Sequence, residues 1–173
     1  VFSPDSKRVA YTLTSGRIPT LSDRHDRPHV EVYGHKQFVV VDNQEGKAYD
    51  NIQLGPVVPF FPFGSIFSPD SMHPAYSVRA GDKEFMVVDG KAGKAYDEIS
   101  VLPERAFSPD SQYLVYAARS GDKWFVVVNN KESAPYAKIS DQSEFVFDSP
   151  SSFHYLAVIG QSVHLVQEKL VHK

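Results

Sequence analysis

The 173-residue chain contains no cysteine, so disulfide bonds and thiolate-ligated metal sites are excluded, and the redox environment of the protein stays open. No apolar run approaches the roughly 18 residues that a membrane-spanning helix needs. The sequence therefore predicts no membrane insertion.

A long run of one charge sign is also missing. The 18 basic and 21 acidic side chains leave a formal net charge of −3 and are spread along the chain. A nucleic-acid partner is not predicted, because proteins that bind nucleic acids gather Lys and Arg in one segment or on one face.

Helical periodicity is absent as well, since no stretch keeps apolar residues at i, i+3, i+4 and i+7 over three turns. Hydrophobic residues make up 42% of the chain and aromatic residues 13%, which is enough for packed cores and excludes a disordered or collagen-like class. The composition and patterning predict an all-β protein.

What the sequence does contain is a repeated motif, Phe-Ser-Pro-Asp-Ser. Proline presets φ at the second position of a type I turn, and Ser or Asp side chains can bond to the local backbone. A short strand-like run with a tyrosine at the same place follows each clear copy, so each copy is predicted to form the turn of a β-hairpin. A catalytic serine would not need to recur in every repeat. The copies are Phe2–Ser6, Phe67–Ser71 and Phe107–Ser111, with a degenerate copy at Phe147–Ser152.

The spacing of the motif predicts the architecture. The phenylalanines at 67, 107 and 147 lie 40 residues apart, whereas 65 residues separate Phe2 from Phe67. A period near 40 built from short strands predicts β-propeller blades, each a four-stranded antiparallel sheet. About four repeats are present, with blades near residues 1–53, 65–100, 105–140 and 145–173, and the first interval carries 25 extra residues.

Each repeat is expected to hold four strands in chain order. The first strand ends at the turn motif, the second follows it, and the third is the most apolar run, as in Glu84–Asp89. The fourth is expected to contain a Tyr-Asp-x-Ile segment, which spans Tyr49–Ile52 and Tyr96–Ile99. The last repeat stops after its third run, so its sheet is expected to lack an outer strand.

These residues resemble the TolB-type, WD-like propeller repeats of bacteria, which are marked by Phe-Ser-Pro-Asp-Gly/Ser followed by Ala-Tyr or Ala-Phe. The resemblance covers nearly the whole chain and includes the Val87–Asp97 segment. It implies a periplasmic or extracellular protein with about six to eight blades, so these residues would be a fragment of a larger propeller. Serine in place of glycine at the end of each motif predicts a slightly weaker turn.

The resemblance leaves the activity open. Such propellers serve as protein-binding modules, as gating domains of prolyl-oligopeptidase-type peptidases, and occasionally as enzymes. No motif of a catalytic domain accompanies the repeats in this sequence, so no catalytic residue and no cofactor is predicted.

Comparison of the repeats places the extra residues in two segments. One is residues 17–33, between the second and third strands of the first repeat, and the other is residues 55–64, in the link to the second repeat. In an up-and-down blade these two connections emerge on the same face, so both insertions are expected on one rim. Loops on a rigid scaffold are the usual place for binding residues.

The first insertion is polar. It holds His25, His29 and Glu31, and ends at Tyr33, and its His and carboxylate side chains are types that ligate divalent metals. Pro28 between the histidines rules out a regular helix that would align them, so no metal site is assigned. A binding loop with polar contacts and a solvated loop both stay open.

The second insertion is apolar. It carries Phe60, Phe61 and Phe63 among three prolines, which is a large aromatic content for a connecting segment. The phenylalanines either fill the space between blades or form an exposed aromatic patch for a partner.

The leading hypothesis from the sequence is a non-enzymatic propeller module that binds a protein or an extended ligand through residues 17–33 and 55–64. One alternative is the propeller domain of a hydrolase or peptidase, or a metal-dependent rim site. Another is a blade array that only spaces other domains. We further expect the natural protein to extend upstream of Val1, and these residues alone to form an open arc that can self-associate.

Overall fold

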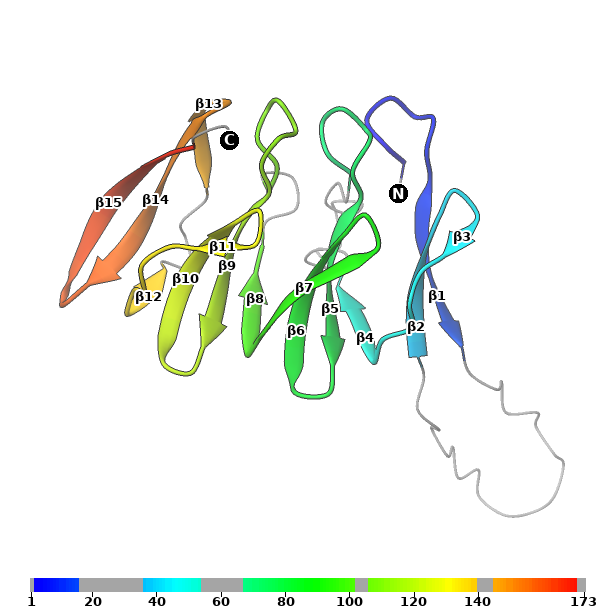
Figure 1. Cartoon of the computed structure of the whole chain (residues 1–173), viewed down its shortest axis with the longest axis horizontal. Helices are drawn as coiled ribbons and strands as arrows, with labels where there is room; N and C mark the ends of the chain where they lie inside the picture. Colours follow the sequence, from blue (N-terminus) through cyan, green and yellow to red (C-terminus); the bar gives the residue numbers. More distant parts are fainter. Residues whose placement is uncertain (1, 16–35, 54–66, 102–105, 140–144, 171–173) are drawn as a thin grey trace, which may run out of the picture.

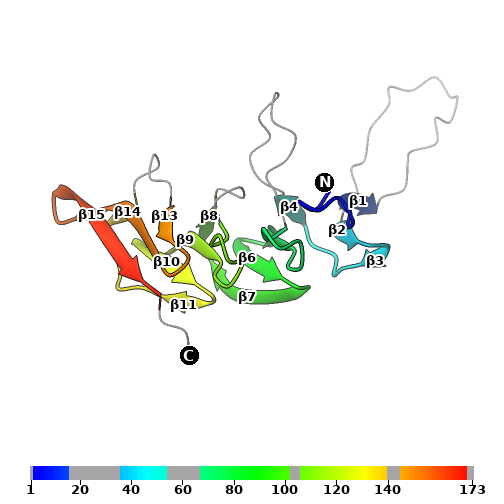
Figure 2. The ribbon, with the colours of Figure 1, turned by 90° about the horizontal axis from the view of Figure 1, so that it is seen from above.

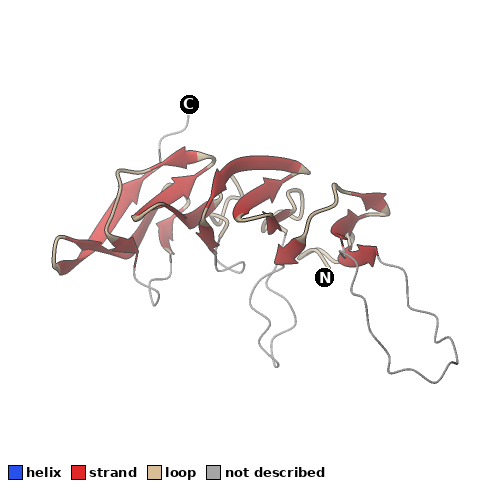
Figure 3. Cartoon of the chain, turned by 90° about the horizontal axis from the view of Figure 1, so that it is seen from below, coloured by secondary structure: helices blue, strands red, loops and turns tan. Residues whose placement is uncertain are grey.

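The computed structural model describes residues 2–15, 36–53, 67–101, 106–139 and 145–170, and in these ranges regular structure consists only of β-strands (Figures 1 and 3). The described part holds no helix that could cross a membrane. The predicted all-β fold class is confirmed. The strands are β1 (Ala10–Ser15), β2 (Lys36–Val41), β3 (Gln44–Glu45), β4 (Asn51–Gln53), β5 (Ala75–Ala80), β6 (Lys83–Val88), β7 (Lys91–Tyr96), β8 (Glu98–Ser100), β9 (Val115–Ser120), β10 (Lys123–Val128), β11 (Lys131–Glu132), β12 (Lys138–Ile139), β13 (Val146–Ser149), β14 (Ser152–Ile159) and β15 (Ser162–Lys169).

The strands form four antiparallel sheets, which we call sheets I to IV. Sheet I has the order β1-β2-β3, sheet II β4-β5-β6-β7 and sheet III β8-β9-β10-β11. In sheet IV, β12 and β13 lie along one side of β14 and β15 pairs with its other side. The four sheets stand side by side in an open row, with sheet I and sheet IV at opposite ends, in the manner of propeller blades (Figures 1 and 2).

The Tyr-Asp-x-Ile segment does not form a single fourth strand, so that prediction is wrong. Tyr49 bridges Gln37 at the outer edge of sheet I, whereas Ile52 pairs with Val78 in sheet II. The second copy behaves in the same way, because β7 ends at Tyr96 in sheet II and β8 opens sheet III. Each segment is therefore the crossing from the outer edge of one sheet to the first edge of the next.

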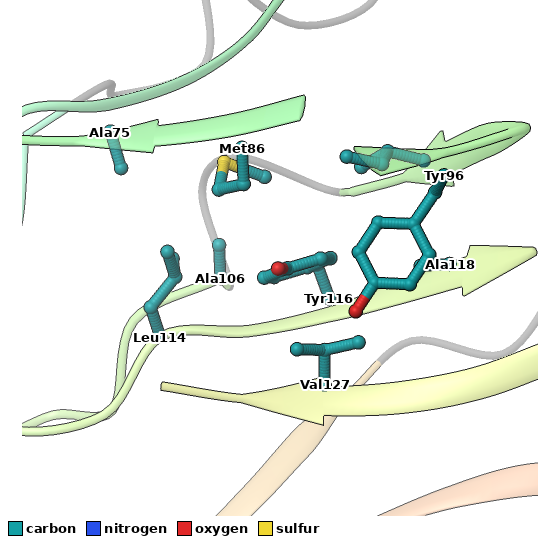
Figure 4. Close-up of a cluster of buried hydrophobic side chains, with 9 residues drawn as sticks. Ala75, Met86, Tyr96, Ala106, Leu114, Tyr116, Ala118 and Val127 are labelled. Atoms are coloured by element: carbon teal, nitrogen blue, oxygen red, sulfur yellow. The ribbon is translucent and has the colours of Figure 1, made fainter. Parts of the chain in front are cut away.

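Three hydrophobic cores fill the spaces between neighbouring sheets. Their members alternate along each strand, so that in sheet II Tyr76 and Val78 face sheet I while Ala75 and Met86 face sheet III. Figure 4 shows the core between sheets II and III, where Met86 and Tyr96 from one sheet meet Leu114 and Tyr116 from the next. An interior sheet is thus apolar on both faces, unlike a sheet with one face in water.

A pair of tyrosines recurs at these interfaces. Tyr96 and Tyr116 meet edge to face with ring centroids 6.4 Å apart, and Tyr136 and Tyr155 do so at 6.0 Å with their hydroxyls 2.9 Å apart. In each pair the first ring belongs to a crossing and the second to the central strand of the following sheet. Burial raises the pKa of Tyr116 to about 12, so this hydroxyl stays protonated at neutral pH.

The aspartate of each of the first two crossings holds the turn of the following sheet. Asp97 accepts hydrogen bonds from the Gly121 amide at 2.6 Å and the Lys83 ammonium at 2.5 Å. Asp50 accepts from Gly81 at 2.7 Å and is bonded to Lys36. A polar side chain from β6 or β2 holds the isoleucine that follows the aspartate. Glu84 of β6 accepts a hydrogen bond from the Ile99 amide at 2.6 Å, and Gln37 of β2 accepts one from the Ile52 amide at 2.8 Å.

The third crossing lacks these groups. It runs through Tyr136, Ala137 and Ile139, so the exposed Ala137 stands where the other crossings have aspartate, and Trp124 stands where they have Gln37 and Glu84. The turn of sheet IV still offers the glycine amide, at Gly160, and Lys123 occupies the position of Lys83. The third interface therefore lacks the aspartate contact, although the glycine amide and the lysine that would bind such a carboxylate are both present.

We expect Ala137→Asp to stabilise the protein, because the new carboxylate would accept hydrogen bonds from the Gly160 amide and the Lys123 ammonium. A charged hydrogen bond of this kind contributes about 1 kcal/mol, which corresponds to a rise in Tm of roughly 2–4 °C for a chain of this length. Ala134→Asp, which adds the same charge elsewhere in that connection, is the control. Equal thermal unfolding midpoints for the two variants would contradict the assignment.

The clamps also predict a pH dependence of stability. The Lys83 hydrogen bond, followed by that of the Gly121 amide, lowers the pKa of Asp97 below its usual 3.8. A carboxyl with a depressed pKa stabilises the fold fully above its unfolded pKa and loses that contribution as the pH falls through the folded pKa. Urea unfolding of Asp97→Asn and the unmodified chain should therefore differ most near neutral pH and converge below about pH 4. A stability difference that stays the same from about pH 7 to about pH 3 would contradict this role of the Asp97 carboxylate.

The turn motifs form a second series of contacts at the opposite end of the sheets. The last serine of each motif has a positive φ, 67° at Ser71 and 63° at Ser111, a conformation that favours glycine. Its hydroxyl compensates, because Ser71 Oγ accepts the Asp5 amide of the preceding sheet at 3.1 Å and Ser111 Oγ accepts the Asp70 amide at 3.0 Å. Serine therefore links successive motifs, which glycine could not do.

Glycine substitution should separate these two effects of serine. Ser6 has φ 59° and is exposed, whereas Ser71 is buried in its contact with Asp5. Both Ser6→Gly and Ser71→Gly relax the backbone, but only the second removes the link between sheets. We expect Ser71→Gly to be the less stable variant by about 1 kcal/mol in urea unfolding. Equal stabilities would contradict a role for the hydroxyl.

Candidate binding surface

The residues that the sequence singled out lie outside the described residues. His25, His29, Glu31 and Tyr33 fall in residues 16–35, and Phe60, Phe61 and Phe63 fall in residues 54–66. Their predicted role in binding stays a prediction. The structure does describe the strand residues to which both segments are attached.

The first segment is attached at the end of a strand pair. Ser15 and Lys36 pair with each other on the last rung of β1 and β2. The equivalent rungs of sheets II and III, Ala80 with Lys83 and Ser120 with Lys123, are closed by two-residue turns. These turns and the crossings Asp50 and Asp97 share one end of the sheets, which we call the turn rim.

The second segment is attached elsewhere. Gln53 pairs with Ser77 and Phe67 with Pro74, so both ends lie along the same edge of the β5 strand. The rim on which residues 55–64 lie falls outside the described residues, so the prediction of a common rim stays a prediction. At the attachment points the chain has already crossed to sheet II at Asp50, so Gln53 and Phe67 both belong to the first edge of sheet II.

The opposite end of the sheets carries the turn motifs, and we call it the motif rim. A cleft opens here between each pair of neighbouring sheets, and residues of a hairpin that follows a third strand line each of the three. The cleft between sheets I and II measures about 420 Å³, that between II and III about 380 Å³ and that between III and IV about 570 Å³. All three fall in the usual size range of small-ligand sites.

The cleft between sheets III and IV has an apolar floor and a polar mouth. The buried Val126 and Phe153 lie at its base, and the exposed Lys131 and Lys169 stand on opposite walls. The carboxylate of Glu132 binds Lys94 of sheet II at 2.7 Å, which lowers the pKa of Glu132. No sequence motif marks this cleft, because its lining comes from separate strands and their turns.

Ion pairs hold several of the charges around the other two clefts. Arg8 binds Asp42 at 2.7 Å and also donates to the Met72 carbonyl at 2.6 Å, and His73 lies 2.9 Å from Asp89. The described ranges hold no group of three or more His, Asp or Glu side chains that could hold a metal ion. In these ranges the geometry therefore fits polar and apolar contacts rather than metal ligation.

Comparisons with known proteins do not narrow the function. No protein-family model matches the chain, and no curated protein matches it either.

Proposed function

We propose that this chain is a non-enzymatic module of TolB-like propeller type that binds a protein or an extended ligand through residues 17–33 and 55–64. The observation that carries the proposal is that the contacts between sheets repeat, whereas these two segments depart from the repeat. The crossing clamps at Asp50 and Asp97 and the motif links at Ser71 and Ser111 have the same form. Constant strands with two divergent connections are typical of a scaffold that presents a binding surface.

The way in which the segments are attached supports the same proposal. Residues 17–33 connect a strand pair that a two-residue turn closes in the other sheets, so the fold does not need their length. Residues 55–64 interrupt an edge whose two parts both pair with β5. Neither insertion is required for strand pairing, and a binding role accounts for their composition.

The test replaces each segment with the chain's own shorter equivalent. Residues 16–35 become Gly-Asp, which recreates the Ser120–Lys123 turn between Ser15 and Lys36, and residues 54–66 become the Val101–Ala106 sequence. The intact and shortened proteins are applied to an array of folded proteins, extended peptides and polysaccharides. We expect the shortened protein to lose binding at least about tenfold, because its contact residues are gone.

Thermal unfolding of the shortened protein is the control. Its Tm should match or exceed that of the intact chain, because closing a shorter connection costs less entropy. Equal binding by two folded proteins would contradict the proposal and would direct attention to the clefts of the motif rim.

A further inference from the structure

The cleft between sheets I and II contains a space that is filled in the next interface. In sheet I the amide of Gly46 donates to the Val39 carbonyl at 2.8 Å, and both residues line the cleft. A Cβ atom at Gly46 would lie 3.3 Å from the Tyr76 hydroxyl, so this hydroxyl reaches the cleft beside the glycine. In sheet II the equivalent glycine is Gly93, and a Cβ atom there would lie 2.7 Å from the side-chain oxygen of Asn130. Asn130 therefore occupies the space that stays open beside Gly46.

The space stays open because the facing hairpin has a glycine in place of this asparagine. Asp89-Gly90 follows β6 in sheet II, and Asn129-Asn130 follows β10 in sheet III. Gly90 has φ 74° and Asn130 has φ 66°, so the two backbones turn in the same way. Gly90 lines the cleft, and a Cβ atom there would meet nothing within 4 Å. One asparagine side chain at this position would therefore fill the space.

A buried hydroxyl without a partner lines the same cleft. Tyr76 is 6% exposed, and its hydroxyl forms no hydrogen bond within the described residues. The equivalent Tyr155 hydroxyl is bonded to Tyr136 and Glu168, whereas that of Tyr116 is unpaired but lines none of the three clefts. Burial raises the pKa of Tyr76 to about 12, so its hydroxyl is uncharged at neutral pH and its oxygen can accept a hydrogen bond. A ligand that bonds to this group would relieve the cost of its burial.

The charged side chains of the cleft have an excess of carboxylates. They are those of Arg8, Asp42, Glu45 and Asp89. Arg8 is held by Asp42 at 2.7 Å and by two backbone carbonyls. Glu45 is exposed and forms no ion pair or hydrogen bond in the part of the chain that the structure describes. The cleft thus offers a negative acceptor at Glu45 and a neutral one at Tyr76.

We propose that this cleft binds an organic ammonium group together with the apolar carbon chain that carries it. An ammonium group has donors and no acceptor, so it complements Glu45 and the Tyr76 hydroxyl. The carbon chain would pack on Val39, Met72 and Pro74, which line the same cleft. A free amine and a lysine side chain of a peptide share this chemistry. The inference does not depend on the proposed function of residues 17–33 and 55–64.

Isothermal titration calorimetry tests the ligand class with three probes of similar shape. Phenethylamine is the cation, phenethyl alcohol its neutral counterpart and hydrocinnamate its anionic counterpart. We expect phenethylamine to bind with a Kd of about 1 mM or lower, at least about fivefold more tightly than the other two. In NMR spectra the bound amine should shift the amide signals of Gly46 and Gly90. Equal or tighter binding of either other probe, or no binding of phenethylamine up to about 10 mM, would overturn the proposal.

Variants place the bound amine in the cleft. Glu45→Gln removes the charge and Tyr76→Phe removes only the hydroxyl, so each should weaken phenethylamine binding at least about threefold. Gly90→Asn should weaken it at least about tenfold, because the new side chain would fill the space as Asn130 does in the next interface. Gly81→Asn makes the same change at φ 64° on the turn rim, and this control should bind like the unmodified chain. Binding at the unmodified strength by Glu45→Gln or by Gly90→Asn, with an unchanged Tm, would contradict the assignment.

A peptide distinguishes the two sources of the ammonium group. The probe is a Gly-Lys-Gly peptide with blocked ends, and its control is the same peptide with the lysine acetylated. Tighter binding of the peptide than of phenethylamine would identify a protein segment as the ligand, and the reverse order would identify a small molecule. Equally tight binding of the acetylated and unmodified peptides would overturn the role of the ammonium group.

Discussion

The structure depends on the burial of apolar sheet faces against neighbouring sheets. Sheets II and III are apolar on both faces, so neither could stand alone in water, and each gains its stability only between two others. Burial of a side chain such as Val78 or Val126 contributes about 1.5–3 kcal/mol relative to exposure. The row therefore behaves as a one-dimensional array in which the interface, rather than the single sheet, is the unit of stability.

The polar contacts fix the relative position of neighbouring sheets, whereas the apolar contacts supply most of the stability. Asp97 and Ser111 lie at opposite ends of the interface between sheets II and III, where one holds the Gly121 turn and the other holds the Asp70 amide. Apolar faces alone could slide, since the hydrophobic effect has no direction. Two hydrogen-bonded points at the two ends of an interface fix both the position and the rotation of one sheet on the next.

The fold class, the four-sheet repeat and the motif turns could be predicted from the sequence, because they follow from period, strand alternation and turn chemistry. The crossing at Asp50 was missed although the segment does not alternate like a strand. Tyr49 and Ile52 are three residues apart and would point to opposite faces of one strand, yet both are buried in the same core because they pair with different sheets. A usable signal was present in the aspartate that recurs at the first two crossings. The clefts of the motif rim could not be predicted either, because they form only where two sheets pack together and their lining residues are far apart in the sequence. The candidate residues in 17–33 and 55–64 lie outside the described residues, so their role stays a prediction.

The two insertions lie where added length costs the scaffold little. The connection from Gln53 to Phe67 is about twice as long as that from Ser100 to Phe107, and a doubling of loop length costs only about 0.6 kcal/mol in closure entropy. Both of its ends pair with β5, so the register of sheet II does not depend on what lies between them. The same holds for Ser15 and Lys36, whose pairing matches that of Ser120 and Lys123. Insertion at either place leaves the core contacts between sheets intact, whereas one residue added within β5 or β9 would turn the following side chains to the wrong face. Sequence change can therefore accumulate at these two attachments without loss of the fold, which is the condition under which a repeat scaffold can acquire a specific binding surface.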